Sequence, residues 1–278
     1  MKNFGLLLFF PILAFADFLP HNSQKIPASQ KGTGLTEEQF NKIIDKVEKV
    51  YAPVVYNYGG ILWIWRKWND PTVNAGTYRV EGDFNWYVNL YGGFARHPMI
   101  TEDGFALVAC HEIGHHIGGA PKKEIEPIPF WAGAEGQSDY WTTLKCLRQV
   151  FAMDNSQEAI ANLNVPKIVI TECQKSFKTD WESALCIRTS MAGLSVANVM
   201  ADTQEISLPS FEDKDQTVAT STINSHPSPQ CRLDTYFQGS ICPVSSYVWI
   251  SQENAVTGTC HPSLGYTRGN RPLCWYTP

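Results

Sequence analysis

Hydrophobic side chains recur at helical spacing near the N-terminus, over residues 36–51. Thr36 and Gln39 fit a capping box at the start of this segment. The apolar positions share one face of a helix with 3.6 residues per turn, and they are Phe40, Ile43, Ile44, Val47, Val50 and Tyr51. We therefore predict an amphipathic helix over residues 36–51, closed by Pro53.

Further along the chain, the pattern predicts both strands and helices. Short runs of β-branched and aromatic residues between Gly, Asn and Asp indicate strands, at residues 61–65, 77–81 and 86–91. Longer apolar segments indicate helices, at residues 101–117, 134–151, 181–203 and 229–238. No internal repeat is found. The fold class that this order predicts is α+β, with a small antiparallel sheet and a mostly helical C-terminal half.

Residues 1–16 have the composition of a secretory signal peptide. Lys2 supplies a positive charge, an uncharged run follows, and Ala14-Phe15-Ala16 has the small-x-small pattern that signal peptidase reads. We predict cleavage between Ala16 and Asp17, so that the protein is secreted or periplasmic. The uncharged run is shorter than the ~20 residues that span a bilayer, and no permanent membrane anchor is predicted.

The cysteines agree with export. There are eight of them, and an even number in an exported chain predicts disulfides. No pair has the CxxC spacing of a cysteine-built zinc site. Cys231 with Cys242, and Cys260 with Cys274, are suggested as bridges by their closeness in sequence. We divide the chain into the signal (1–16), an extended lead-in (17–34), a main domain (35–240) and a cysteine-containing tail (241–278).

Charge and composition restrict the class of partner. The 278 residues are 44% hydrophobic and carry 22 Lys and Arg against 27 Asp and Glu, a net charge of −5. This composition excludes a disordered chain. Proteins that follow a phosphate backbone need a basic surface. No nucleic-acid partner is therefore predicted.

The segment His111-Glu112-Ile113-Gly114-His115 matches the motif HExxH inside a predicted helix. His111 and His115 lie one turn apart on one face, so both imidazoles can bind the same metal ion. Glu112 is placed to act as a general base on water at that ion. The neighbouring His116 points away from the pair and is predicted to be a packing or rim residue.

A catalytic zinc site needs a third protein ligand. Glu135 follows His115 by twenty residues, and Asp139 lies one turn later on the same helix face. We predict that Glu135 is a ligand of Zn²⁺ and that Asp139 accepts the free N–H of a ligand histidine. A metzincin-type site instead takes a third histidine ten residues after the first. Pro121 stands at that position and has no ligand atom.

The order of these motifs resembles the gluzincin metallopeptidases of the CAAX-prenyl-protease and HtpX-like family. The features that carry the resemblance are Asn74-Ala75, the strand Trp86–Tyr91, the HExxH helix, the helix with Glu135 and Asp139, and His226-Pro227 with Arg232. The resemblance implies a zincin-like fold in which residues 35–240 form a zinc metallopeptidase domain. It implies that His111, His115 and Glu135 bind Zn²⁺. It also implies catalytic roles for Glu112 as the base and for His226 and Arg232 as donors to the oxyanion.

These residues predict a zinc-dependent endopeptidase, an enzyme of the hydrolase class. Its substrate would be a peptide or protein, paired along the strand Trp86–Tyr91 by β-augmentation. Three alternatives stay open: a non-catalytic exported domain that holds zinc or binds a partner, a metzincin-type hydrolase, and a hydrolase of a non-peptide amide. The open fourth ligand position and the intact Glu112 favour the peptidase.

Overall fold

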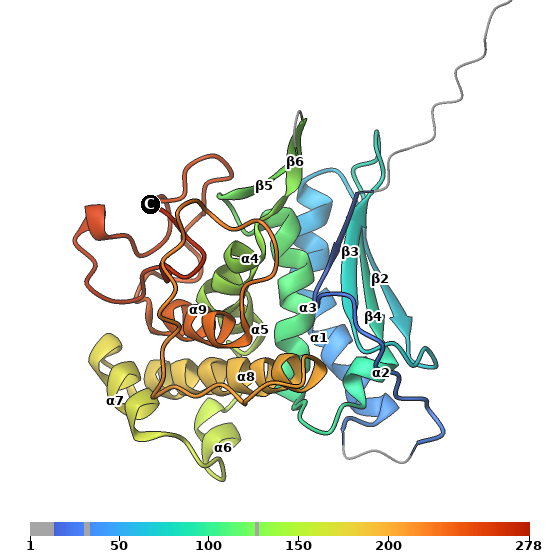
Figure 1. Ribbon diagram of the computed structural model, residues 1–278, viewed down its shortest axis with the longest axis horizontal. Helices are drawn as coiled ribbons and strands as arrows, with labels where there is room; N and C mark the ends of the chain where they lie inside the picture. Colours follow the sequence, from blue (N-terminus) through green and yellow to red (C-terminus); the bar gives the residue numbers. More distant parts are fainter. Residues whose placement is uncertain (1–13, 31–33, 126–127) are drawn as a thin grey trace, which may run out of the picture.

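The computed structural model describes residues 14–30, 34–125 and 128–278 and has the predicted α+β class (Figure 1). Its main sheet has the order β1-β3-β4-β2. The strands are Ala14–Asp17 (β1), Leu62–Lys67 (β2), Ala75–Arg79 (β3) and Trp86–Tyr91 (β4). Strand β3 is antiparallel to β1 and β4, but β2 is parallel to β4. The sheet is therefore mixed rather than antiparallel as predicted, because β4 inserts between β3 and β2.

The N-terminal segment forms one edge of this sheet. Strand β1 contains the predicted cleavage point, whereas the rest of the predicted signal, residues 1–13, lies outside the described residues. After β1 the chain is extended, with Phe18 and Leu19 buried in the core. Asn74 holds this segment in place, because its side chain bonds both the N–H and the carbonyl of Leu19, at 2.9 and 3.2 Å.

The first helix, α1 (Glu37–Asn57), starts as predicted and ends later. Thr36 and Gln39 form the capping box. The helix passes through Pro53, so the predicted end at this residue is wrong. Tyr51 and Val55 are 2% and 0% exposed, and burying them against the core outweighs the cost of about 3 kcal/mol that a proline imposes inside a helix.

Helix α3 (Glu102–Ile117) runs through the middle of the molecule, as Figure 1 shows. It follows the short helix α2 (Gly92–Ala95), and Thr101 caps its N-terminus. The sheet and α1 lie on one side of α3, and the later helices lie on the other. Residues 104–116 of α3 are all buried. A helix enclosed in this way has an apolar composition all round instead of one apolar stripe.

A β-hairpin that sequence analysis missed connects α3 to the next helix. Its strands are Lys122–Ile125 (β5) and Ile128–Gly133 (β6). The predicted helix over 134–151 is present in three joined parts, namely α4 (Glu135–Trp141), the π-helical segment Thr142–Cys146 and α5 (Leu147–Val150). The hairpin thus delivers the chain to the first residue of α4, which is Glu135.

The remaining helices cover the other side of α3. They are α6 (Ser156–Ile160), α7 (Lys167–Ser176), α8 (Asp180–Thr203) and α9 (Pro229–Ile241). Among the described residues, α8 alone is long and apolar enough to cross a membrane, but 83% of its most apolar window is buried inside the protein. It packs against α3, α7 and α9, as a core helix does.

Four disulfides close the structure: Cys110–Cys146, Cys173–Cys186, Cys231–Cys274 and Cys242–Cys260. The predicted disulfides are present, but the two suggested pairings in the C-terminal part are wrong. The real bridges there are nested, because the tail folds back over α4 and α9 and returns Cys274 to the start of α9.

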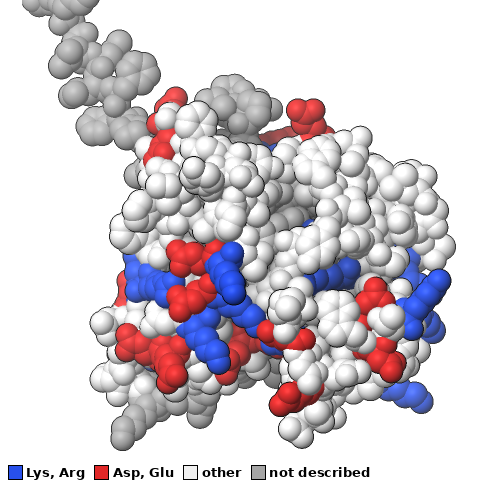
Figure 2. All heavy atoms as spheres, turned by 180° about the vertical axis from the view of Figure 1, so that it is seen from behind, with Lys and Arg blue, Asp and Glu red and all other residues white. Residues whose placement is uncertain are grey.

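Charged side chains of both signs are interspersed on the face seen in Figure 2, and the upper part of that face is largely uncharged. No broad patch of Lys and Arg covers this face. Arg66 illustrates the pattern, since it pairs with both Asp45 and Glu48 at 2.6 Å.

Candidate metal centre

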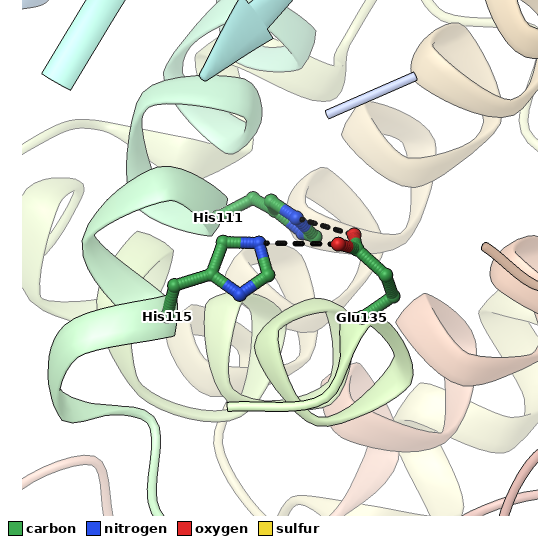
Figure 3. Close-up of side chains that lie close together, drawn as sticks. All are labelled: His111, His115 and Glu135. Atoms are coloured by element: carbon green, nitrogen blue, oxygen red, sulfur yellow. Dashed lines mark hydrogen bonds and ion pairs between the residues drawn. The ribbon is translucent and has the colours of Figure 1, made fainter. Parts of the chain in front are cut away.

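Two neighbouring helices bring the three predicted ligands together. His111 and His115 project from α3 toward Glu135 on α4 (Figure 3). His111 Nε2 lies 3.1 Å from Glu135 Oε2, and His115 Nε2 lies 3.6 Å from Glu135 Oε1. All three side chains are 0% exposed. One potential ligand atom from each lies within 4.8 Å of the other two.

The close approach of α3 and α4 depends on Gly114, inside the HExxH motif. A methyl group at this position would overlap Ser138 Oγ and would lie 3.0 Å from a ring carbon of Trp141. The Ser138 hydroxyl donates to the carbonyl of His111 and so joins the two helices directly. Glycine at this position therefore allows Glu135 to reach the histidines.

The hydrogen bonds of the two imidazoles fix which nitrogen carries a proton. His115 Nδ1 lies 2.9 Å from the carbonyl oxygen of Gly133, and His111 Nδ1 lies 2.7 Å from Asp139 Oδ1. Both partners are acceptors, so each Nδ1 must be the donor. In the neutral rings, each Nε2 then presents a lone pair toward the carboxylate of Glu135.

The lone pair on each Nε2 and the negative charge of the Glu135 carboxylate repel each other unless a cation lies between them. His115 Nε2 is buried and has no hydrogen-bond partner among the described residues. Two zinc ligands at tetrahedral angles are about 3.4 Å apart when each bond is about 2.1 Å long. The observed separations of 3.1 and 3.6 Å, one to each carboxylate oxygen of Glu135, lie on either side of this value. The three side chains therefore form a group that could hold a divalent metal ion.

Asp139 contacts the Nδ1 atom of His111. Its Oδ1 also accepts hydrogen bonds from Tyr236 Oη and from Arg232 Nη2, each 2.7 Å long. Burial works to raise the pKa of Asp139, but the charge of Arg232 and the hydrogen bonds from His111 and Arg232 outweigh it and hold that pKa below its usual value. Asp139 thus stays ionised and can accept the Nδ1–H of His111.

Arg232 does not lie where a donor to the oxyanion would have to be, although that role was predicted for it. Its Nε and Nη2 bond Asp139, its Nη1 donates to the carbonyl of Phe18 at 2.7 Å, and the side chain is 1% exposed. The guanidinium is therefore buried between Asp139 and Phe18 and is not presented to a substrate. The expectation of direct catalysis by Arg232 is corrected to a positioning role, because the residue holds Asp139, which in turn holds His111.

Glu112 lies beside His111, with both carboxylate oxygens buried and without a hydrogen-bond partner among the described residues. Burial raises the pKa of Glu112 well above the ordinary value, and the nearby charges of Glu135 and Asp17 add to this effect. A buried carboxyl group with free oxygens next to a metal site has the arrangement of a general base.

His226 contacts the N-terminal segment at the rim of the candidate metal centre. Its Nε2 donates to the carbonyl oxygen of Asp17 at 2.7 Å and lies 3.7 Å from Glu135 Oε2. Its side chain is 21% exposed, whereas the three ligand side chains are fully covered. The predicted donor is thus near the centre and is already bonded to a peptide carbonyl.

Sequence reasoning missed two residues at this site. Lys123 Nζ lies 2.6 Å from Glu135 Oε1, and the only sequence signal was a pair of adjacent lysines in the unrecognised hairpin. Burial would raise the pKa of Glu135, but His115 and Lys123 hold it well below the ordinary value. Phe18 contacts His111 edge-on with ring centroids 4.8 Å apart, and nothing in its local sequence indicates this.

Strand Trp86–Tyr91 was predicted to pair with the substrate, but it has no free edge in the sheet. Strand β4 pairs with β3 on one edge and with β2 on the other. Both rows of its backbone groups are therefore occupied, and an added peptide cannot pair there. The inserted position of β4, which the sequence does not specify, accounts for this difference.

Comparisons with protein-family models, with curated proteins and with solved structures found no match. They assign no family to this chain. The resemblance to the HtpX-like peptidases rests on the motif order alone and stays a prediction.

Proposed function

We propose that this protein is a zinc-dependent endopeptidase of the gluzincin type with a zincin-like catalytic domain. One observation carries the proposal: the Nε2 atoms of His111 and His115 lie 3.1 and 3.6 Å from the carboxylate oxygens of Glu135 in a fully buried setting. This arrangement is favourable when the three residues share a divalent cation.

The chain's own residues supply the parts of a hydrolytic reaction. A bound zinc ion would act as a Lewis acid on the scissile carbonyl and on water. Glu112 would take a proton from the attacking water and transfer it to the nitrogen of the leaving amine. His226 would donate its Nε2–H to the developing oxyanion, a contact worth about 3 to 4 kcal/mol when well placed. Asp139 and Arg232 would keep His111 in the orientation that binding needs.

The ligand count supports catalysis over a structural role. Structural zinc sites close with four protein ligands, whereas catalytic sites keep one position open. The described residues offer three ligands in one group, namely His111, His115 and Glu135. His226, the nearest further nitrogen donor, presents a proton to Asp17 rather than a lone pair. A structural site also has no use for the unpartnered carboxyl of Glu112.

The test is a casein-type digestion by the purified protein, with and without a chelator. We expect hydrolysis that the chelator stops and added zinc restores. Glu112→Gln should retain the metal and lose hydrolysis, whereas Glu102→Gln, at the exposed start of the same helix, should retain both. Metal bound in stoichiometric amount with no hydrolysis would favour the non-catalytic zinc-holding domain. Hydrolysis of a cell-wall amide but not of casein would favour the non-peptide amidase.

A further inference from the structure

A cavity of about 440 Å³ lies beside strand β5, and none of the three candidate metal ligands lines it. The β5–β6 pairing is irregular between Lys122 and Glu124. Lys123 contacts Glu135, while its neighbour Lys122 lines the cavity. The cavity opens between the sheet, the end of α3 and the β5–β6 hairpin. Its lining includes Arg79, Trp86, His116, Lys122, Trp131 and Gln252.

Arg79 brings a guanidinium with spare donors into this cavity. Its Nε donates to His116 Nδ1 at 3.0 Å, and its Nη2 makes only a long contact of 3.5 Å to the carbonyl of His116. Its Nη1 has no acceptor, and Arg79 has no ion-pair partner, within the part of the chain that the structure describes. By contrast, the guanidinium of Arg148 is surrounded by four backbone carbonyls, with which it makes hydrogen bonds of 2.5 to 3.2 Å.

Lys122 supplies a second positive charge. Its ammonium donates to Gln252 Oε1 at 2.7 Å, and it too has no ion-pair partner among the described residues. Burial and the charge of Arg79 lower the pKa of Lys122 to about 8. Asp83 also lines the cavity and makes no ion pair with either cation among the described residues. Its carboxylate accepts hydrogen bonds from Tyr87 Oη and from the backbone N–H of Asn85.

Aromatic rings hold Arg79 in position and exclude water from its faces. His116 stacks between Trp86 and Trp131, with ring centroids 4.8 and 4.6 Å away. The guanidinium carbon of Arg79 lies 5.5 Å from the ring centroid of Trp86 and 5.1 Å from that of Trp131. A cation stacked on rings keeps the edge of its guanidinium available for a planar anion. Such an edge matches a carboxylate with two parallel hydrogen bonds.

We propose that this cavity is a specificity pocket that binds an acidic side chain of the peptide substrate. The inference rests on the proposed function for its substrate class. Gly76 of β3 lies opposite Asp17, whose carbonyl His226 holds at the metal centre. Arg79 is three residues farther along the same strand, a distance of about 10 Å. The pocket therefore selects a glutamate or aspartate about three residues from the peptide bond that is cut.

The test compares the binding and the hydrolysis of matched peptides. The probes are blocked alanine-rich octapeptides that carry one glutamate, moved through each position, or glutamine in its place. Binding is measured by titration calorimetry on the zinc-loaded Glu112→Gln protein, in which turnover is absent. We expect the best glutamate peptide to bind about 10- to 100-fold tighter than its glutamine counterpart, as for a charged hydrogen bond. In the wild-type protein, kcat/KM should show the same preference.

Arg79→Gln and Lys122→Gln should each remove most of this preference while the zinc content stays at the wild-type level. Arg66→Gln, which removes a cation from strand β2 of the same sheet, should leave the preference intact. Equal affinity for glutamate and glutamine peptides, or no measurable binding of any glutamate peptide, would overturn the pocket. Acid-selective binding without hydrolysis in the wild type would support the pocket and contradict the proposed peptidase. Hydrolysis without a preference for glutamate peptides would support the proposed peptidase and contradict the pocket.

Discussion

The Oδ1 atom of Asp139 accepts the Nδ1–H of His111 at 2.7 Å, and this contact sets the direction in which the other ring nitrogen points. Asp139 is itself held by Arg232 through two hydrogen bonds of 2.7 Å. A residue from α9, 121 positions after His111, thus takes part in orienting the metal centre. Arg232 thus acts on the centre through Asp139, whereas His226 lies at its rim.

Asp139→Asn should weaken the metal centre and the fold together. We expect metal affinity to fall about 10- to 100-fold, because His111 loses the acceptor that orients it. The free energy of unfolding should fall by about 3 to 5 kcal/mol, because Arg232 is left buried without a counter-ion. Chelator competition and urea unfolding measure the two quantities. Asp202→Asn is the matched control, since Asp202 contacts His97 away from the centre; an equal loss of metal affinity there would contradict the assignment.

Glu112→Gln should stabilise the metal-free protein, and increasingly so as the pH rises. Burial raises the pKa of Glu112 above its ordinary value of 4.5. The folded state therefore binds a proton that the unfolded state releases, and stability falls as the pH rises through that window. The variant removes this loss, so its advantage should grow by up to about 1.4 kcal/mol per pH unit above pH 4.5. Urea unfolding in chelator at pH 5 and pH 7 tests this, and an advantage independent of pH would contradict it.

Lys123→Met should tighten metal binding several-fold. The ammonium of Lys123 lies 2.6 Å from Glu135 Oε1, where it competes for the carboxylate and repels a divalent cation. Lys122→Met is the matched control, because the ammonium of Lys122 donates to Gln252 instead of Glu135. We expect its metal affinity to stay within about twofold of the wild-type value in titrations with a chelating dye. Weaker binding by Lys123→Met would show that the lysine supports the site instead.

Replacing Cys110 and Cys146 by serine should lower the free energy of unfolding by about 4 kcal/mol, since the bridge closes a loop of 36 residues. The bridge also ties α3, which carries the histidines, to the helical segment that continues α4. Metal affinity should therefore fall as well. The same double replacement at Cys173 and Cys186 removes a 13-residue loop and should cost about 3 kcal/mol with metal affinity unchanged. Equal metal affinity in both double variants would contradict the role given to Cys110–Cys146.

The sequence could predict the parts of this structure whose signals are local. The capping box at Thr36 places the start of α1, and Thr101 places the start of α3. The spacing of His111 and His115 puts both on one helix face whatever surrounds them. Glu135 follows from the chemical requirement for a third ligand, and the structure brings it to both histidines.

Other parts depend on contacts between distant segments and left no local pattern. The pairing of β1 with β3 joins residues more than fifty positions apart. The β5–β6 hairpin contains prolines and adjacent lysines, which are untypical of strands. Arg232 was identified from its spacing to His226, but spacing does not tell whether a guanidinium faces the substrate or a buried carboxylate. The pairing of the cysteines also depends on how the tail folds over α9, because eight cysteines allow many connectivities.

The most direct measurement for the whole account is the metal content of the purified protein by native mass spectrometry. We predict one zinc ion per chain in the wild type and in Glu112→Gln, and none in His115→Ala or Glu135→Ala. The account would be contradicted by a wild-type chain that binds no divalent metal when zinc is supplied. It would equally be contradicted by a Glu135→Ala protein that holds zinc as tightly as the wild type does.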